Sequence, residues 1–210
     1  MKPAEKIGPI LELLAKHYPE AHCTLDFKNP LELVVATVLS AKCTDVRVNQ
    51  VTPAVFNKYP TAAAYAQAPL PELEEAVRPT GFFRNKAKAV CGLSAAIVSR
   101  HGGRVPETME ELTALPGVGR KTASILLGAC FVAPALPVDT HVARVSFRLG
   151  LTASKDPGKI EEDLSKAVPR GKWWEFTTRL GWHGRQVCTA RKPGCASCGL
   201  APVCPRRGVR

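Results

Sequence analysis

The sequence contains no uninterrupted apolar run long enough to cross a bilayer, which argues against a membrane-spanning protein. Its first twenty residues alternate charged and apolar side chains and lack the continuous hydrophobic segment of a secretory signal peptide. No long internal repeat and no low-complexity linker interrupt the chain. These absences predict a globular protein of an intracellular, reducing compartment.

Dipeptides typical of tight β-hairpins are also absent between alternating polar and apolar runs, which argues against a β-rich fold. Apolar residues instead recur at helical spacing, as in residues 7–14. Further helices are expected over 83–101, where two glycines follow, and over 160–169 and 173–188. Residues 29–59 are expected to be helical after an Asn-Pro start signal, although their Val- and Leu-rich start is also compatible with a buried strand. The sequence as a whole predicts an all-α fold.

Acidic side chains are scarce: 18 Asp and Glu stand against 29 Lys and Arg, which gives a formal net charge of +11. The imbalance is strongest in residues 171–210, where eight basic residues accompany a single acidic one. A strongly basic chain favours a polyanionic partner, and nucleic acid is the first candidate. A soluble protein that is merely basic remains the alternative.

The stretch VPETMEELTALPGVGRKTA predicts two helices joined by a glycine-rich turn. Thr108 followed by Glu111 fits a capping box, and the first helix is expected to run to about Leu115. The turn occupies residues 116–119, and the second helix is expected to start near Val118.

Such a turn leaves several backbone amides without partners at the start of the second helix. Gly117, Val118 and Gly119 would therefore offer an anion site suited to a DNA phosphate. An ordinary corner between two helices is the alternative. Two cations, Arg120 and Lys121, follow in the first turn, where the positive end of the helix dipole opposes positive charge.

The C-terminal region holds four cysteines in a C-x6-C-x2-C-x5-C pattern. In a reducing compartment such a cluster indicates metal binding rather than disulfides. The spacing alone leaves structural zinc and a [4Fe–4S] cluster both open. The four candidate ligands are Cys188, Cys195, Cys198 and Cys204.

LPGVGRKTA, then VDTHVARV, then these cysteines resemble the endonuclease III branch of the helix-hairpin-helix DNA glycosylases. LSAKCTD, GFFRNKA and CTARKPGCASCGLAPVC extend the resemblance over essentially the whole chain. It implies a [4Fe–4S] cluster and two all-α lobes with a cleft between them. The lobe of residues 22–134 would carry the hairpin, and residues 1–21 and 135–210 would form the cluster lobe.

The resemblance also implies a bifunctional base-excision repair enzyme that removes oxidised pyrimidines and then nicks the strand by β-elimination. Its partner would be double-stranded DNA with a damaged base or an abasic site. The resemblance further implies a monomer that does not associate with a membrane. The expected location is the cytoplasm of a bacterium, in association with the nucleoid. A monofunctional glycosylase of the same superfamily and a non-catalytic DNA-binding iron–sulfur protein are the alternatives.

Lys121 and Asp139 are the predicted catalytic residues. An amine can displace the base at C1′ and form a Schiff base with the opened sugar, and the helix N-terminus beside Arg120 favours its neutral form. Asp139 precedes an apolar helix as an N-cap would, and a fixed carboxylate there can assist proton transfer. A phosphate contact for Lys121 and a purely structural cap for Asp139 are the alternatives; His141 is expected to be structural.

Further DNA contacts are expected outside the hairpin. Phe82 is a candidate wedge for the space left by an extruded base, with core packing as its alternative. Lys42 stands where the family usually has Gln, and a lysine can donate hydrogen bonds but cannot accept them. Arg191 and Lys192 lie in the loop between the first two cysteines and are expected to contact backbone phosphates.

Overall fold

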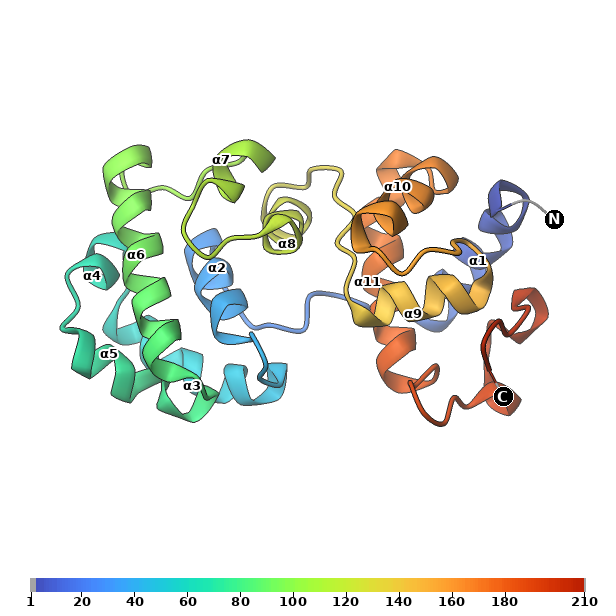
Figure 1. The fold of residues 1–210 in the computed structure, drawn as a ribbon, viewed down its shortest axis with the longest axis horizontal. Helices are drawn as coiled ribbons and strands as arrows, with labels where there is room; N and C mark the ends of the chain where they lie inside the picture. The colour runs from blue at the N-terminus through green and yellow to red at the C-terminus, as the bar shows by residue number, and fades with distance from the viewer. Residues whose placement is uncertain (1–2, 210) are drawn as a thin grey trace. The chain divides into compact units, whose positions relative to one another are not determined.

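The computed structural model describes residues 3–209. Within that range every secondary-structure element is a helix, and no strand is present (Figure 1). This confirms the predicted all-α fold. Along the same residues, no helix combines the length and apolar character that crossing a membrane requires. The chain divides into two compact units: one is Cys23–Val132, and the other joins Met1–His22 to Ala133–Arg210.

In the Cys23–Val132 unit, local sequence signals determine where the first helix begins. Asn29 caps it by accepting a hydrogen bond from the Glu32 amide at 2.9 Å, and Pro30 occupies the first turn. The Val- and Leu-rich segment after it is a buried helix, so the strand alternative is wrong. The chain leaves the helix at Ser40, and Thr44 caps the next one. The elements of this unit are α2 (Pro30–Leu39), α3 (Asp45–Lys58), α4 (Ala62–Ala66), α5 (Leu70–Val77), η1 (Arg78–Thr80), α6 (Phe83–His101), α7 (Met109–Thr113) and α8 (Arg120–Cys130).

The second unit is built from both ends of the chain, because the N-terminal helix packs against helices that follow residue 133 (Figure 1). Ile10 and Leu14 of that helix share one hydrophobic cluster with Leu164, Phe176 and Leu180. Burial of this apolar face is the main force that holds the unit together. Its elements are α1 (Pro3–His17), α9 (Thr140–Leu149), α10 (Pro157–Ala167), η2 (Arg170–Lys172), α11 (Trp173–Gln186), η3 (Cys195–Ser197) and η4 (Ala201–Val203).

Two phenylalanines with opposite exposure test this assignment of the core. Phe176 is 1% exposed and Phe82 is 63% exposed. We expect Phe176→Ala to lower the free energy of unfolding by about 3–5 kcal/mol, because it leaves a cavity in the cluster. The matched control Phe82→Ala should change it by less than about 0.5 kcal/mol. Urea denaturation followed by circular dichroism measures both, and equal effects would contradict this description of the core.

Candidate functional site

The predicted hairpin is present in the Cys23–Val132 unit. Thr108 caps α7, where its Oγ1 accepts from the Glu111 amide at 3.3 Å and donates to the Glu111 carboxylate at 2.8 Å. Helix α7 ends at Thr113 and α8 begins at Arg120, so each predicted helix end was wrong by about two residues. The turn takes up more of the chain because Gly117 adopts φ +77°, a left-handed conformation that favours glycine.

The start of α8 offers free backbone donors and a cation. The first hydrogen bond inside the helix runs from the Ala123 amide to the Gly119 carbonyl at 3.0 Å. The amides of Lys121 and Thr122 therefore have no acceptor within the helix. A Cβ built on Gly119 would meet no atom within 4 Å, so the turn can be approached closely, and the Lys121 side chain is exposed. This terminus can receive an anion.

The structure brings Lys42 and Phe82 together from two separate loops. The Lys42 Nζ lies 5.3 Å from the centroid of the Phe82 ring, within the range of a cation–π contact. Phe82 is 63% exposed, so core packing does not account for it. Both side chains line one cavity, together with Gly117 and Thr122 of the hairpin region. The cavity has about 830 Å³ of space free of protein atoms, part of it open to solvent.

Asp139 is the N-cap of α9, as predicted. Its Oδ1 accepts hydrogen bonds from the amides of His141 at 2.8 Å and Val142 at 2.7 Å. Its Oδ2 lies 3.6 Å from the guanidinium of Arg185, an ion pair that the sequence did not indicate. The carboxylate is thus fixed in position and partly exposed, which are the properties required of a general base or an electrostatic stabiliser.

His141 is held by structural contacts. Its Nδ1 is hydrogen-bonded to Arg144 Nη2 at 3.1 Å. Burial of the ring lowers the pKa of His141 from its ordinary value, which favours the neutral imidazole. Lys121 and Asp139 belong to different compact units.

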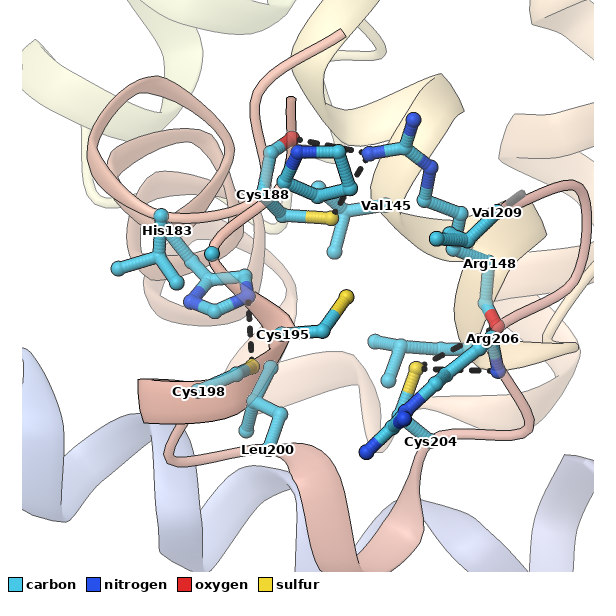
Figure 2. A pocket seen from close by; sticks show the side chains of 14 residues that line it. Val145, Arg148, His183, Cys188, Cys195, Cys198, Leu200, Cys204, Arg206 and Val209 are labelled. Carbon is cyan, nitrogen blue, oxygen red and sulfur yellow. Dashed lines mark hydrogen bonds between the residues drawn. The ribbon is translucent and has the colours of Figure 1, made fainter. Parts of the chain in front are cut away.

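The four predicted ligands gather around one cavity in the second unit (Figure 2). Cys188, Cys195, Cys198 and Cys204 all line it, and none forms a disulfide. Apolar side chains, among them Leu149 of α9, complete the wall around about 350 Å³ of space free of protein atoms, part of it open solvent. In residues 3–209, no three His, Cys, Asp or Glu side chains are arranged to hold a single metal ion.

Arg148 of α9 organises the cysteine loop, and sequence reasoning missed it. Its side chain is nearly buried, and its Nη1 donates to Cys188 Sγ at 3.2 Å and to the Thr189 carbonyl at 2.7 Å. Its Nη2 donates to the Ala190 carbonyl at 3.0 Å. These bonds hold the start of the loop, so the adjacent Arg191 and Lys192 lie exposed to solvent on a braced segment.

His183 of α11 makes a second contact with the cysteines. Its Nδ1 is hydrogen-bonded to the Tyr18 hydroxyl at 2.8 Å, and its Nε2 lies 3.7 Å from Cys198 Sγ (Figure 2). Burial lowers the pKa of His183 to about 4, so the ring between the hydroxyl and the thiol is neutral at pH 7. Tyr18 and His183 are 165 residues apart in the sequence, and no local pattern indicates their contact.

Comparisons with known proteins agree with this geometry. The family model described as "HhH-GPD superfamily base excision DNA repair protein" matches residues 35–170. The endonuclease III of Synechocystis sp. is 52% identical over 202 residues, which cover 96% of this chain and 92% of the relative.

Two solved structures are similar throughout, and both contain DNA. A non-covalent endonuclease III–DNA complex is 43% identical with a TM-score of 0.93, covering 98% of this chain and 97% of that one. A trapped endonuclease III–DNA covalent intermediate is 43% identical with a TM-score of 0.92 and the same coverage. The chain therefore belongs to the HhH-GPD superfamily of base excision DNA repair proteins and, within it, to the endonuclease III family.

Proposed function

We propose that this chain removes oxidised pyrimidines from duplex DNA, with Lys121 as the nucleophile and Asp139 as its proton acceptor. It is a bifunctional DNA glycosylase and AP lyase of base excision repair, like its endonuclease III relatives. The observation that carries the proposal is the exposed amine of Lys121 in the first turn of α8, beside backbone amides that can hold a phosphate. A covalent protein–DNA intermediate has been trapped in a 43% identical relative.

The chemistry follows from an amine placed at the sugar. Lys121 Nζ attacks C1′, the bond from C1′ to the base breaks, and the departing base takes up a proton. Opening of the sugar ring leaves an iminium between Nζ and C1′. The iminium acidifies the C2′ hydrogen, and loss of that proton breaks the bond from C3′ to its phosphate oxygen. Water then releases the lysine.

Asp139 supports this sequence through its position as a cap. The nucleophile must be neutral when it attacks, so the ammonium proton needs an acceptor. The amides of His141 and Val142 hold the Asp139 carboxylate in one orientation. The same negative charge stabilises the positive character that develops at C1′ when the base leaves.

DNA binding is distributed over both units in this proposal. The turn at Gly117, Val118 and Gly119 would bind a backbone phosphate, and the open space above Gly119 supports a close approach. Arg191 and Lys192 would contact further phosphates without reading sequence. The protein would act as a monomer.

Lys42 and Phe82 would enter the duplex beside an extruded base. The exposed ring of Phe82 can stack on neighbouring bases, and Lys42 can donate to an acceptor on the opposite strand. Their contact across 5.3 Å supports a role as one unit.

The cysteine site fits a [4Fe–4S] cluster. A single tetrahedral zinc ion needs its sulfurs about 2.3 Å from one point. In contrast, within residues 3–209 no three His, Cys, Asp or Glu side chains are arranged around one such point, and the four thiols instead line a shared, largely apolar cavity. Cys188, Cys195, Cys198 and Cys204 would hold the cluster, which would cross-link the C-terminal loops. Arg148 would donate to the first thiolate.

The role of Lys121 is tested by the pair Lys121→Ala and Lys121→Arg. We expect both variants to lose borohydride trapping on abasic duplex DNA and to lose strand nicking by roughly 10³-fold or more, because neither side chain can form the imine under these conditions. Lys121→Arg should keep DNA affinity within about threefold, since it retains the charge that a phosphate would contact. If Lys121→Arg nicked the DNA at the wild-type rate, Lys121 would not be the nucleophile, and a phosphate contact would be its only role. Wild-type base removal without a trapped adduct would identify a monofunctional enzyme, and tight binding without any cleavage a non-catalytic DNA-binding protein.

The role of Asp139 is separated from capping by Asp139→Asn. Asparagine is an equally good N-cap, so we expect the free energy of unfolding to change by less than about 1 kcal/mol. Base removal from a duplex containing thymine glycol should fall by roughly 10²–10⁴-fold, because an amide cannot accept the proton. Single-turnover kinetics measure this loss, and Asp139→Ala reports the cost of the missing cap. Full activity of Asp139→Asn would reduce the residue to a structural role.

The metal content distinguishes the two candidate groups at the cysteines. We expect about four iron and four sulfide per chain in anaerobically purified protein, as one [4Fe–4S] cluster requires. Cys198→Ala should lower the iron content, whereas Cys91→Ala, outside the site, should not. Elemental analysis with sulfide quantification gives both numbers. About one zinc per chain without sulfide would refute the cluster.

A further inference from the structure

Helix α6 begins with a buried cation. The Lys86 side chain is 5% exposed, although it lies in the first turn of the helix. Its Nζ donates to the Leu39 carbonyl and to the Thr80 carbonyl, each at 2.7 Å. Burial of the ammonium lowers the pKa of Lys86 from its ordinary value. Two short hydrogen bonds to carbonyls offset part of that desolvation cost.

The two carbonyls belong to the two segments that lead into the loops of Lys42 and Phe82. Leu39 is the last residue of α2, three positions before Lys42, and Thr80 lies two positions before Phe82. The Lys86 amide also donates to the Phe82 carbonyl at 3.1 Å. Lys86 therefore contacts the backbone of two segments, the one that leads to Lys42 and the one that leads to Phe82.

Both loops adopt an unfavourable backbone conformation. Lys42 has φ +52° and Phe82 has φ +48°, in the left-handed region that costs a non-glycine residue roughly 1–2 kcal/mol. No side chain caps α6 at Phe82. Conformations of this kind persist only where surrounding contacts determine them. The Lys86 hydrogen bonds join the two segments, in addition to the contact between Lys42 and Phe82 themselves.

We propose that Lys86 is a positioning residue that holds the two loops in the arrangement that presents Lys42 and Phe82 to the duplex. Lys86 acts through these loops, and its nearly buried side chain also lines the cavity that Lys42 and Phe82 share with the hairpin. The inference rests on the proposed insertion of Lys42 and Phe82. An ammonium suits the role because its three donors can serve carbonyls of different segments, whereas an apolar side chain would leave both carbonyls unpaired.

The test compares Lys86→Met with Lys88→Met, an exposed lysine on the same helix. The first assay follows base removal from a thymine glycol duplex that carries 2-aminopurine next to the lesion, whose fluorescence rises on unstacking. The second follows borohydride trapping on a preformed abasic site in single-stranded DNA, which requires no extrusion. Circular dichroism and urea denaturation establish that each variant is folded.

We expect Lys86→Met to lose the fluorescence rise and to slow base removal by roughly 10- to 100-fold, the cost of misplaced contacts remote from the reacting atoms. Trapping on single-stranded abasic DNA should stay within about threefold of wild type, and Lys88→Met should match wild type in both assays. Lys86→Met combined with Phe82→Ala should be little slower than Phe82→Ala alone, since both changes act on the same loop. Lys86→Gln, which keeps two N–H donors on a shorter, uncharged side chain, should fall between wild type and Lys86→Met.

The remaining outcomes each overturn a specific claim. Wild-type behaviour of folded Lys86→Met would refute the positioning role. An equal loss in both assays would reduce Lys86 to a structural residue. Should Lys86→Met fail to fold, Lys86→Gln carries the same comparison, and its agreement with wild type in both assays would also refute the role. If the wild-type protein itself gives neither a fluorescence rise nor a trapped adduct, the proposed function fails before Lys86 is considered.

Discussion

The second unit depends on the way helix α9 is held at both ends. At its start, the amides of His141 and Val142 fix the Asp139 carboxylate. At its other end, Arg148 binds the carbonyls of Thr189 and Ala190 and the sulfur of Cys188. A helix is a rigid connection over this length. The position of the candidate catalytic carboxylate and the shape of the cysteine loop are therefore set by the same element.

The segment that carries the first cysteine is also bonded directly to helix α9. Arg144, between those two ends, donates to the Gly184 carbonyl at 2.8 Å and to the Cys188 carbonyl at 3.0 Å. Helix α9 is thus joined to the end of α11 as well as to the loop. Loss of order among the cysteines would loosen the same helix that carries Asp139. A group that cross-links the thiols would stabilise the carboxylate without touching the substrate.

The sequence predicted the parts of the fold that short-range physics controls. The caps at Thr108 and Asp139 each involve partners within three residues, and both are present. The break in residues 29–59 and the true ends of α7 and α8 were not predicted, because a turn can take residues from either neighbouring helix at little cost.

The candidate site was predictable only where a local pattern marks it. The four cysteines gather around one cavity as their spacing indicated. The contacts of Lys86 with Leu39, of Arg148 with Thr189 and of Tyr18 with His183 join residues 47, 41 and 165 positions apart. Nothing in the neighbourhood of these residues distinguishes a buried polar side chain from an exposed one. Only the folded chain shows that they hold the loops.

The two candidate catalytic groups occupy equivalent places on separate helices. Lys121 lies in the first turn of α8, and Asp139 is the N-cap of α9. The positive end of each helix dipole favours negative charge and opposes positive charge within that first turn. At α9 the amides of His141 and Val142 hold the Asp139 side chain, whereas at α8 the amides of the first turn are left for an external anion such as a phosphate.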